Sequence, residues 1–419
     1  MKEIIKKKLE QSAQSAGTSI KWVIFALITG LVVGSISTAF HFSIMIATMV
    51  REATPWVIFL LPIGGLIIVR CYRIVKDNKE LSTNSVLSAI HSNEKLPLKM
   101  APLIFVSTVI THLFGGSAGR EGAALQLGGS IGNGLGGLFR FTDNDKHIMI
   151  MCGMSAAFAA LFGTPMAAAI FSMEVISVGI MQYSALVPCV IASLSAFSVA
   201  QAFGVGQELF LVEWVPNFTI FSSAKVIILA VLCAVLSIAF CVMLHQTEHL
   251  YKKLFKNPYL RIVVGGCLII ILTLLVGDQT YNGTGMHVIE EAMKGHVIPY
   301  AFILKMIFTA LTIGAGYKGG EIVPSFFIGA TFGCLFGNVI GFAPDLCAAV
   351  GMASLFCGVT NCPITSLLIS FELFGYEGMP YYLLAIAFSY MLSGYYGLYS
   401  SQRIIYSKYR TQFINRKSH

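Results

Sequence analysis

The sequence predicts an all-α polytopic membrane protein made of two repeats that contain broken and tilted helices. Three observations lead to this fold class: high hydrophobicity, long apolar stretches without strand-like alternation, and a pair of similar motifs in the two halves. Of the 419 residues, 56% are hydrophobic and 11% are charged, whereas soluble domains carry about 25% charged residues. Most of the chain is therefore expected to lie inside a bilayer.

Apolar stretches follow one another along the chain, and several are shorter than the roughly 20 residues that a simple spanning helix needs. Gly or Pro interrupts them, so broken or tilted helices are expected. Because the stretches are continuous, they do not fit the alternating pattern of a membrane β-barrel. They comprise 22–50, 56–69, 101–114, 148–203, 226–244, 262–276, 301–313, 326–342 and 348–398.

The two ends of the chain are basic, and the net charge of +8 is concentrated there. The positive-inside rule then places both termini in the cytoplasm, with the chain crossing the cell (inner or plasma) membrane several times. Residues 1–20 are predicted to form an amphipathic helix on the membrane surface, and residues 403–419 a basic cytoplasmic tail. No nucleic-acid-binding module accompanies the basic runs. The lipid bilayer, not nucleic acid, is the expected partner, and no soluble regulatory domain is expected.

Cysteine and histidine spacing does not indicate a metal or redox centre. The ten cysteines are spread through apolar stretches without a CxxC pair, and the nine histidines show no HExxH pattern. No nucleophile, base and orienting group occur in a readable arrangement. The sequence therefore predicts neither an enzyme nor a bound cofactor or metal.

Two motifs recur in the two halves of the chain. FGTPMAAAIFSMEV at 162–175 and TNCPITSLLISFEL at 360–373 each place a Glu nine residues after a Pro. A Gly-rich stretch with a basic residue and a Glu precedes each motif, and this Glu, Glu121 or Glu321, lies 44 or 42 residues before the Pro. Matching spacing predicts a two-fold repeat of about 200 residues. The predicted parts are a first transmembrane repeat (21–204), a linker (205–222) and a second transmembrane repeat (223–402).

The Gly-rich stretches are the predicted site, because repeats with interrupted helices are typical of transporters that bind substrate at the interruptions. If GSAGREG and YKGGEIVP each turn directly into a helix, the free N–H groups of the first turn and the positive end of the helix dipole form an anion site. Gly119 and Gly122 would let a ligand approach the backbone closely. A transporter of cations or organic solutes is disfavoured, since no set of carboxylates converges.

Glu121 is the central residue of the hypothesis. A charged carboxylate in mid-membrane costs roughly 2.5 to 3.5 kcal/mol on insertion scales, so it should be paired, protonated or functional. One interpretation is a structural ion pair with Arg120, although adjacent helical side chains do not face each other and different partners are expected. In the functional interpretation, Glu121 lies at the helix N-terminus, competes with an anion and leaves when protonated. A cation ligand is the least favoured interpretation.

Four motifs, in order, resemble the CLC family of chloride channels and proton-coupled anion exchangers. They are GREGAALQLG, FGTPMAAAIFSMEV, GGEIVPSFFIGATFG and LYSSQRIIY, and the resemblance spans nearly the whole membrane portion. It implies two inverted-topology repeats and a homodimer with one pathway per subunit. It also implies that Glu121 is the external gate and proton carrier. The residues expected around the anion are Gly119, Arg120, Gly122, the backbone amides of Glu321 and Ile322, and the hydroxyl of Tyr399.

The chain departs from the family pattern at the motif that supplies a serine to the anion. LSTNSV stands in its place, and the 39 residues from Ser82 to Glu121 favour Ser82 over Thr83 and Asn84 as the anion-facing residue. A helix cap is the alternative interpretation of this cluster. Phe327 and Phe356, with Phe326, either line the pathway through their partly positive ring edges or pack in the core.

A second departure concerns protons. Val175 stands where chloride-type exchangers carry an internal proton-transfer Glu. Its loss and the GGE motif resemble the fluoride/proton antiporter branch, in which coupling persists, so Glu321 is either a second proton site or a structural carboxylate. That branch usually carries Met at position 82 and Thr at position 323, where this chain has Ser82 and Val323. The preference between chloride and fluoride is therefore open.

The leading functional hypothesis is a proton-coupled exchanger of small halides, chloride or fluoride, in which Glu121 gates the anion site and carries H⁺. The alternative is an uncoupled passive chloride channel that Glu121 only gates.

Overall fold

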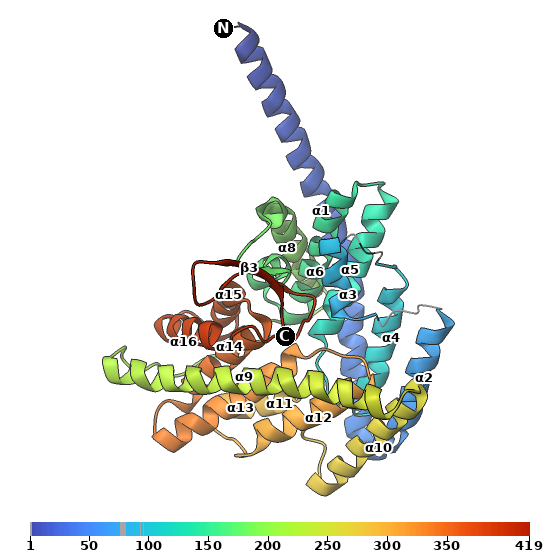
Figure 1. The fold of residues 1–419 in the computed structure, drawn as a ribbon, viewed down its shortest axis with the longest axis vertical. Helices are drawn as coiled ribbons and strands as arrows, with labels where there is room; N and C mark the ends of the chain where they lie inside the picture. Colours follow the sequence, from blue (N-terminus) through green and yellow to red (C-terminus); the bar gives the residue numbers. More distant parts are fainter. Residues whose placement is uncertain (1, 76–80, 93, 95) are drawn as a thin grey trace.

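The computed structural model describes the chain apart from residues 1, 76–80, 93 and 95, and describes side chains from residue 17 onward. Helices dominate this part of the chain (Figure 1). The first-half helices are α1 (Lys2–Ala53), η1 (Pro55–Leu60), α2 (Leu61–Ile74), α3 (Thr83–Ser92), α4 (Met100–Leu113), α5 (Glu121–Leu138), α6 (Asp143–Phe162), α7 (Pro165–Glu174), η2 (Tyr183–Ala185) and α8 (Leu186–Ala202).

The second half has the same character. Its helices are α9 (Ile220–Leu254), α10 (Pro258–Val276), α11 (Met286–Met293), α12 (Ala301–Ala315), α13 (Ile322–Ile340), α14 (Pro344–Thr360), α15 (Pro363–Phe374) and α16 (Met379–Leu392). Among the described residues, seven helical segments are long and apolar enough to cross a membrane. Five further apolar helices have only 10–17 residues, as expected for a membrane protein with broken helices.

The N-terminal segment does not form a separate helix. One continuous helix, α1, runs from Lys2 to Ala53, and its N-terminal part projects away from the rest of the molecule (Figure 1). Residues 2–20, predicted as a surface helix, therefore lead without a break into the first apolar segment.

The two halves pack equivalent helices in equivalent ways. In the first half, α5 crosses α6 where Gly128 faces Gly153, and a Cβ on either glycine would collide with the carbonyl oxygen of the other. In the second half, α13 crosses α14 in the same way at Gly329 and Gly351. Glycine lets two helix backbones approach this closely. The two halves predicted to be repeats thus share the same glycine-mediated helix crossing.

The Pro-to-Glu motifs join the halves to each other. Glu372, near the end of α15, accepts hydrogen bonds from the Met166 and Ala167 N–H groups at 2.9 and 2.8 Å, in the first turn of α7. Glu174, at the end of α7, accepts those of Ile364 and Thr365 at 3.1 and 2.8 Å, in the first turn of α15. Each carboxylate therefore satisfies helix N–H groups that have no partner within their own helix.

The C-terminal segment, predicted as a basic tail, folds back as part of a small sheet. Strand β1 (Ser177–Val178) pairs in parallel with β2 (Arg403–Tyr406), and β2 pairs antiparallel with β3 (Phe413–Lys417). The His419 N–H also donates to the Tyr395 carbonyl at 2.9 Å. These backbone bonds join the segment to the end of α7 and to the turn before Tyr399.

Candidate functional site

The two Gly-rich stretches meet at one point. Gly119 and Gly320 form an isolated antiparallel bridge, in which each N–H donates to the other carbonyl at 2.6 and 2.7 Å. Directly after the bridge, α5 begins at Glu121 and α13 begins at Ile322. The first-turn N–H groups of a helix have no intrahelical partners and carry its positive dipole end. Two such ends lie side by side here, as the sequence predicted.

Glycine is required at this bridge because of the close backbone approach. A Cβ on Gly320 would lie 2.5 Å from the Gly122 nitrogen, and a Cβ on Gly122 would lie 2.9 Å from the Gly320 Cα. Neither contact is tolerable without moving one helix end. The glycines thus hold the two N-termini together.

The Glu121 carboxylate is fully buried and folds back over the start of its own helix. Its Oε2 accepts the Arg120 backbone N–H at 3.0 Å, and its Oε1 accepts Arg120 Nε at 3.3 Å. A carboxylate that accepts a backbone N–H at a helix N-terminus uses the same kind of donor as a bound anion would.

Arg120 is paired with Glu121, which contradicts the expectation that these neighbours have different partners. The expectation assumed that both residues lie within the helix, but Arg120 is the N-cap residue, so the angular spacing of helical side chains does not apply. Its guanidinium also donates to Glu208 Oε1 at 2.5 Å and to the Leu161 carbonyl at 3.3 Å, and contacts His41 Nδ1 at 3.1 Å. The guanidinium is thus engaged by protein groups.

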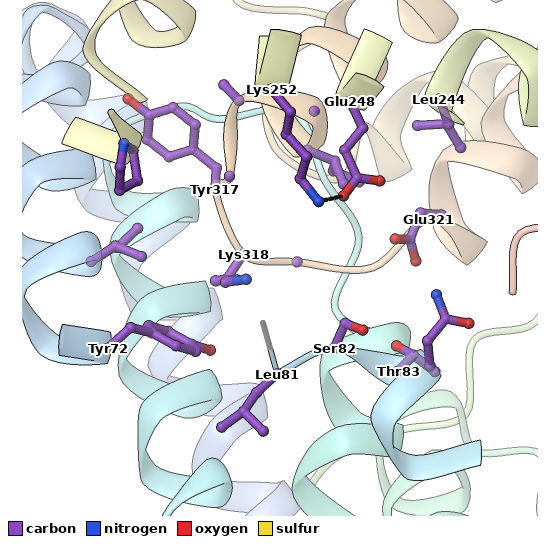
Figure 2. Close-up of a pocket in the computed structure, with 18 of the residues that line it drawn as sticks. Tyr72, Leu81, Ser82, Thr83, Leu244, Glu248, Lys252, Tyr317, Lys318 and Glu321 are labelled. Carbon is purple, nitrogen blue, oxygen red and sulfur yellow. Dashed lines mark ion pairs between the residues drawn. The ribbon is translucent and has the colours of Figure 1, made fainter. Parts of the chain in front are cut away.

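A cavity of about 490 Å³ lies next to the helix crossing. Its walls come from α2, α3 with the segment before it, α5, α9, α10, α12, the α12–α13 connection and residues 398–400. Three of the sequence-predicted site residues, Ser82, Glu321 and Tyr399, line it, and Figure 2 shows Ser82 and Glu321 on either side of the open space. Residues more than 300 positions apart are thereby brought to one cavity.

Among the described residues, the polar atoms of the lining that have no hydrogen-bond partner include Glu321 Oε2, the Tyr399 hydroxyl and Gln126 Oε1. Each atom is buried. Buried polar atoms are nearly always hydrogen-bonded, to protein or to water. Water or a ligand that enters the cavity can supply the partners that these atoms lack.

The LSTNSV segment contributes both a cap of α3 and a link to α5. The Ser82 N–H donates to Ser85 Oγ at 3.3 Å just before α3 begins, while Ser82 itself lines the cavity. Thr83 Oγ1 donates to the Gly122 carbonyl at 3.3 Å and accepts Gln126 Nε2 at 3.1 Å. Ser82 therefore faces the cavity, and Thr83 holds α3 against α5.

Phe356 and Phe327 are not on the lining of this cavity. Phe356 packs against Phe326 and Phe171, with ring centroids 5.2 and 5.8 Å apart. Phe327 lies under Lys305, whose Nζ is 5.1 Å from the ring centroid. Both rings therefore lie in packed surroundings.

Val175 lies outside the cavity as well. Its side chain is fully buried, and its carbonyl accepts Gln402 Nε2 at 3.0 Å. The same nitrogen donates to the Thr360 carbonyl at 2.8 Å. At this position the chain thus has a buried valine, whose backbone is hydrogen-bonded by the Gln402 side-chain amide, and no carboxylate.

Several residues of the site were not singled out from the sequence. Gln126 lies within the Gly-rich motif, so the motif itself was an available signal. Glu208 lies in the linker, and Glu248 lies in the second repeat, where no local pattern marks them.

Comparisons with known proteins agree with this geometry. A family model described as voltage gated chloride channel matches residues 63–394. A chloride/fluoride channel protein of Pseudomonas syringae pv. tomato is 35% identical over 396 residues, covering 93% of this chain and 88% of that protein. An H⁺/Cl⁻ exchange transporter of Vibrio campbellii is 23% identical, covering 86% of this chain and 84% of that protein.

Solved structures are also similar. The crystal structure of a CLC-type fluoride/proton antiporter superposes with a TM-score of 0.89 at 31% identity, covering 92% of this chain and 98% of that one. A slow cyanobacterial Cl⁻/H⁺ antiporter shares the fold, with a TM-score of 0.77 at 20% identity, over 89% of this chain and 94% of that one.

Proposed function

The chain belongs to the voltage-gated chloride channel (CLC) family, and on this premise we propose that it is a proton-coupled exchanger of small halides. The observation that carries the proposal is the Glu121 carboxylate on the N-terminus of α5, beside the Gly119–Gly320 bridge. Relatives described as exchangers of chloride or fluoride for protons support the coupling.

In the proposed cycle, Glu121 and the halide compete for the same helix end. As a carboxylate, Glu121 accepts the Arg120 N–H and closes the site. When it is protonated, it loses its charge and therefore its attraction to the positive helix ends, so the halide can take its place. Arg120 acts by holding Glu121, and the first-turn amides of α5 and α13, including that of Ile322, bind the anion.

Glu321 is the proposed second proton site. Its Oε2 has no hydrogen-bond partner among the residues that the structure describes. A Cβ on Gly122 would lie 3.1 Å from this oxygen, which places the oxygen against the first turn of α5. A Cβ on Gly119 would lie 2.9 Å from Glu121 Oε2. Both carboxylates thus flank the same bridge. Ser82 and Tyr399 contribute hydroxyl groups to an anion in the cavity.

Fluoride is the preferred halide in this proposal. The similarity to the fluoride/proton antiporter, at 31% identity, and to the chloride/fluoride channel protein supports this order. Fluoride is the more tightly hydrated ion and needs strong donors. A protonated Glu321 together with the hydroxyls of Ser82 and Tyr399 supplies such donors.

The cavity of Figure 2 is proposed to open to the cytoplasm. With the N-terminus in the cytoplasm, α1 crosses the membrane once and the segment Pro55–Ile74 crosses back. Arg73 and Leu81, on the cavity wall, then lie on the cytoplasmic side. We also propose a homodimer in the cell membrane, which size measurement of the purified protein in detergent would test.

Reconstitution into liposomes tests the function. An outward-directed gradient of fluoride or chloride should drive uphill H⁺ movement through the wild-type protein. Glu121→Gln should lose this movement while anion flux remains, whereas Glu377→Gln, on an exposed loop, should behave like wild type. Anion flux without H⁺ movement in the wild type would instead establish the passive channel. Unchanged coupling in Glu121→Gln would refute the assigned role.

A further inference from the structure

The charges on the cavity wall favour the halide over the proton, although an exchanger must move both ions. Within the described lining, the charged or titratable groups other than tyrosines are Arg73, His245, Lys252, Arg261, Lys318, Glu248 and Glu321. A wall with more cationic than acidic groups raises the local concentration of anions and lowers that of hydronium. An exchanger that uses this cavity for both ions therefore needs a defined proton acceptor on the wall.

Glu248 has the position that such an acceptor requires. It lies on α9, and Figure 2 shows its carboxylate directed into the same space as Glu321. Its side chain is 47% exposed, so water reaches it, whereas Glu321 Oε2 is buried. A Cβ on Gly314 of α12 would lie 3.2 Å from the Glu248 nitrogen, so this turn of α9 packs firmly against α12.

Lys252 pairs with the Glu248 carboxylate at the cavity. Its Nζ lies 2.7 Å from Glu248 Oε1, one helical turn away on α9. Lys318, on the α12–α13 connection, lies 4.8 Å from the centre of the Tyr72 ring on the cavity wall. Lys252 is thus the direct partner of the Glu248 carboxylate, and Lys318 is a further cation on the same wall.

We propose that Glu248 is the cytoplasmic proton-transfer residue, which passes H⁺ between Glu321 and the cytoplasm. The inference rests on the proposed exchange function. The O–H proton of Glu321 moves through cavity water to a Glu248 oxygen, and Glu248 then releases it to cytoplasmic water or buffer. While Glu248 is neutral, its ion pair with Lys252 is broken.

The test compares Glu248→Gln with Glu291→Gln in liposomes under a halide gradient. Glu291 forms a similar exposed ion pair, with Lys294 at 2.9 Å, and is not on the cavity lining. In weak buffer, Glu248→Gln should slow halide-driven H⁺ uptake by about tenfold, less than the 10²–10⁴ that a positioned proton-transfer group can contribute, because water provides a partial bypass. Glu291→Gln should match the wild type.

Buffer rescue separates proton transfer from structural damage. Raising the concentration of a small buffer such as imidazole on both sides should restore most of the H⁺ rate of Glu248→Gln, because the buffer replaces the missing acceptor. Lys252→Gln, which retains the carboxylate, should keep its H⁺ rate in weak buffer within about twofold of wild type, since a lost exposed ion pair costs little.

Three results would overturn the inference: an unchanged H⁺ rate in Glu248→Gln, a reduced rate that buffer does not restore, or an equal loss in Lys252→Gln. If the wild-type protein drives no uphill H⁺ movement, the exchange function itself fails, and this outcome is read from the wild type alone.

Discussion

Glu372 binds the N-terminus of α7, and its removal should destabilise the fold by a predictable amount. Glu372→Ala leaves the Met166 and Ala167 N–H groups, now bonded at 2.9 and 2.8 Å, without their carboxylate. A hydrogen bond to a charged group contributes about 1.5 to 3 kcal/mol, so two of them give about 3 to 6 kcal/mol. Glu372→Gln keeps one acceptor oxygen and should lose about half of this stability.

Thermal unfolding of the detergent-purified variants, followed by tryptophan fluorescence, measures the effect. The apparent melting temperature should fall in the order wild type, Glu372→Gln, Glu372→Ala, and Glu377→Ala should not change it. Glu174 joins the same two helices from the opposite end. Once one carboxylate has been removed, removing the other should cost less stability. The double variant should therefore lose less stability than the sum of Glu174→Ala and Glu372→Ala. A Glu372→Ala variant as stable as Glu377→Ala would refute the reciprocal capping.

Two further predictions concern the site itself. Gly320→Ala should abolish halide transport, since its Cβ would lie 2.5 Å from the Gly122 nitrogen; Gly137→Ala, with no atom within 4 Å of the new Cβ, is the matched control, and normal flux in Gly320→Ala would contradict the close crossing. Tyr399→Phe should leave the melting temperature unchanged, because the hydroxyl has no hydrogen-bond partner among the described residues. The same variant should weaken halide binding about fivefold, the equivalent of roughly 1 kcal/mol for one hydrogen bond, and unchanged halide affinity, measured by calorimetry, would exclude Tyr399 from the site.

The agreement between sequence and structure is closest where function depends on local backbone geometry. The Gly-rich stretches before Glu121 and Ile322 indicated two helix starts, because glycine and a following apolar run are local signals. The spacing from Pro to Glu indicated the repeat. Ser82, Glu321 and Tyr399 were predicted from motif resemblance and do line one cavity.

Sequence patterns were less informative for side chains whose partners lie far away along the chain. Arg120 contacts Glu208, 88 residues away, and its N-cap position allows the contact with Glu121 that helical spacing argued against. The C-terminal segment was predicted as a basic tail, but its pairing with Ser177–Val178 depends on a strand edge more than 200 residues upstream.

The sequence by itself determined that this protein is helical, lies in a membrane, consists of two repeats and carries Glu121 at a helix start. These properties follow from composition, period and spacing, which are local. Only the tertiary structure decided that Glu174 and Glu372 cap each other's helices. It also decided that the Gln402 amide donates to the Val175 carbonyl, and that Glu248 lines the same cavity as Glu321. Such contacts depend on how helices from distant parts of the chain pack together. The choice of partner side chains in that packing is not marked by any periodic pattern in the sequence.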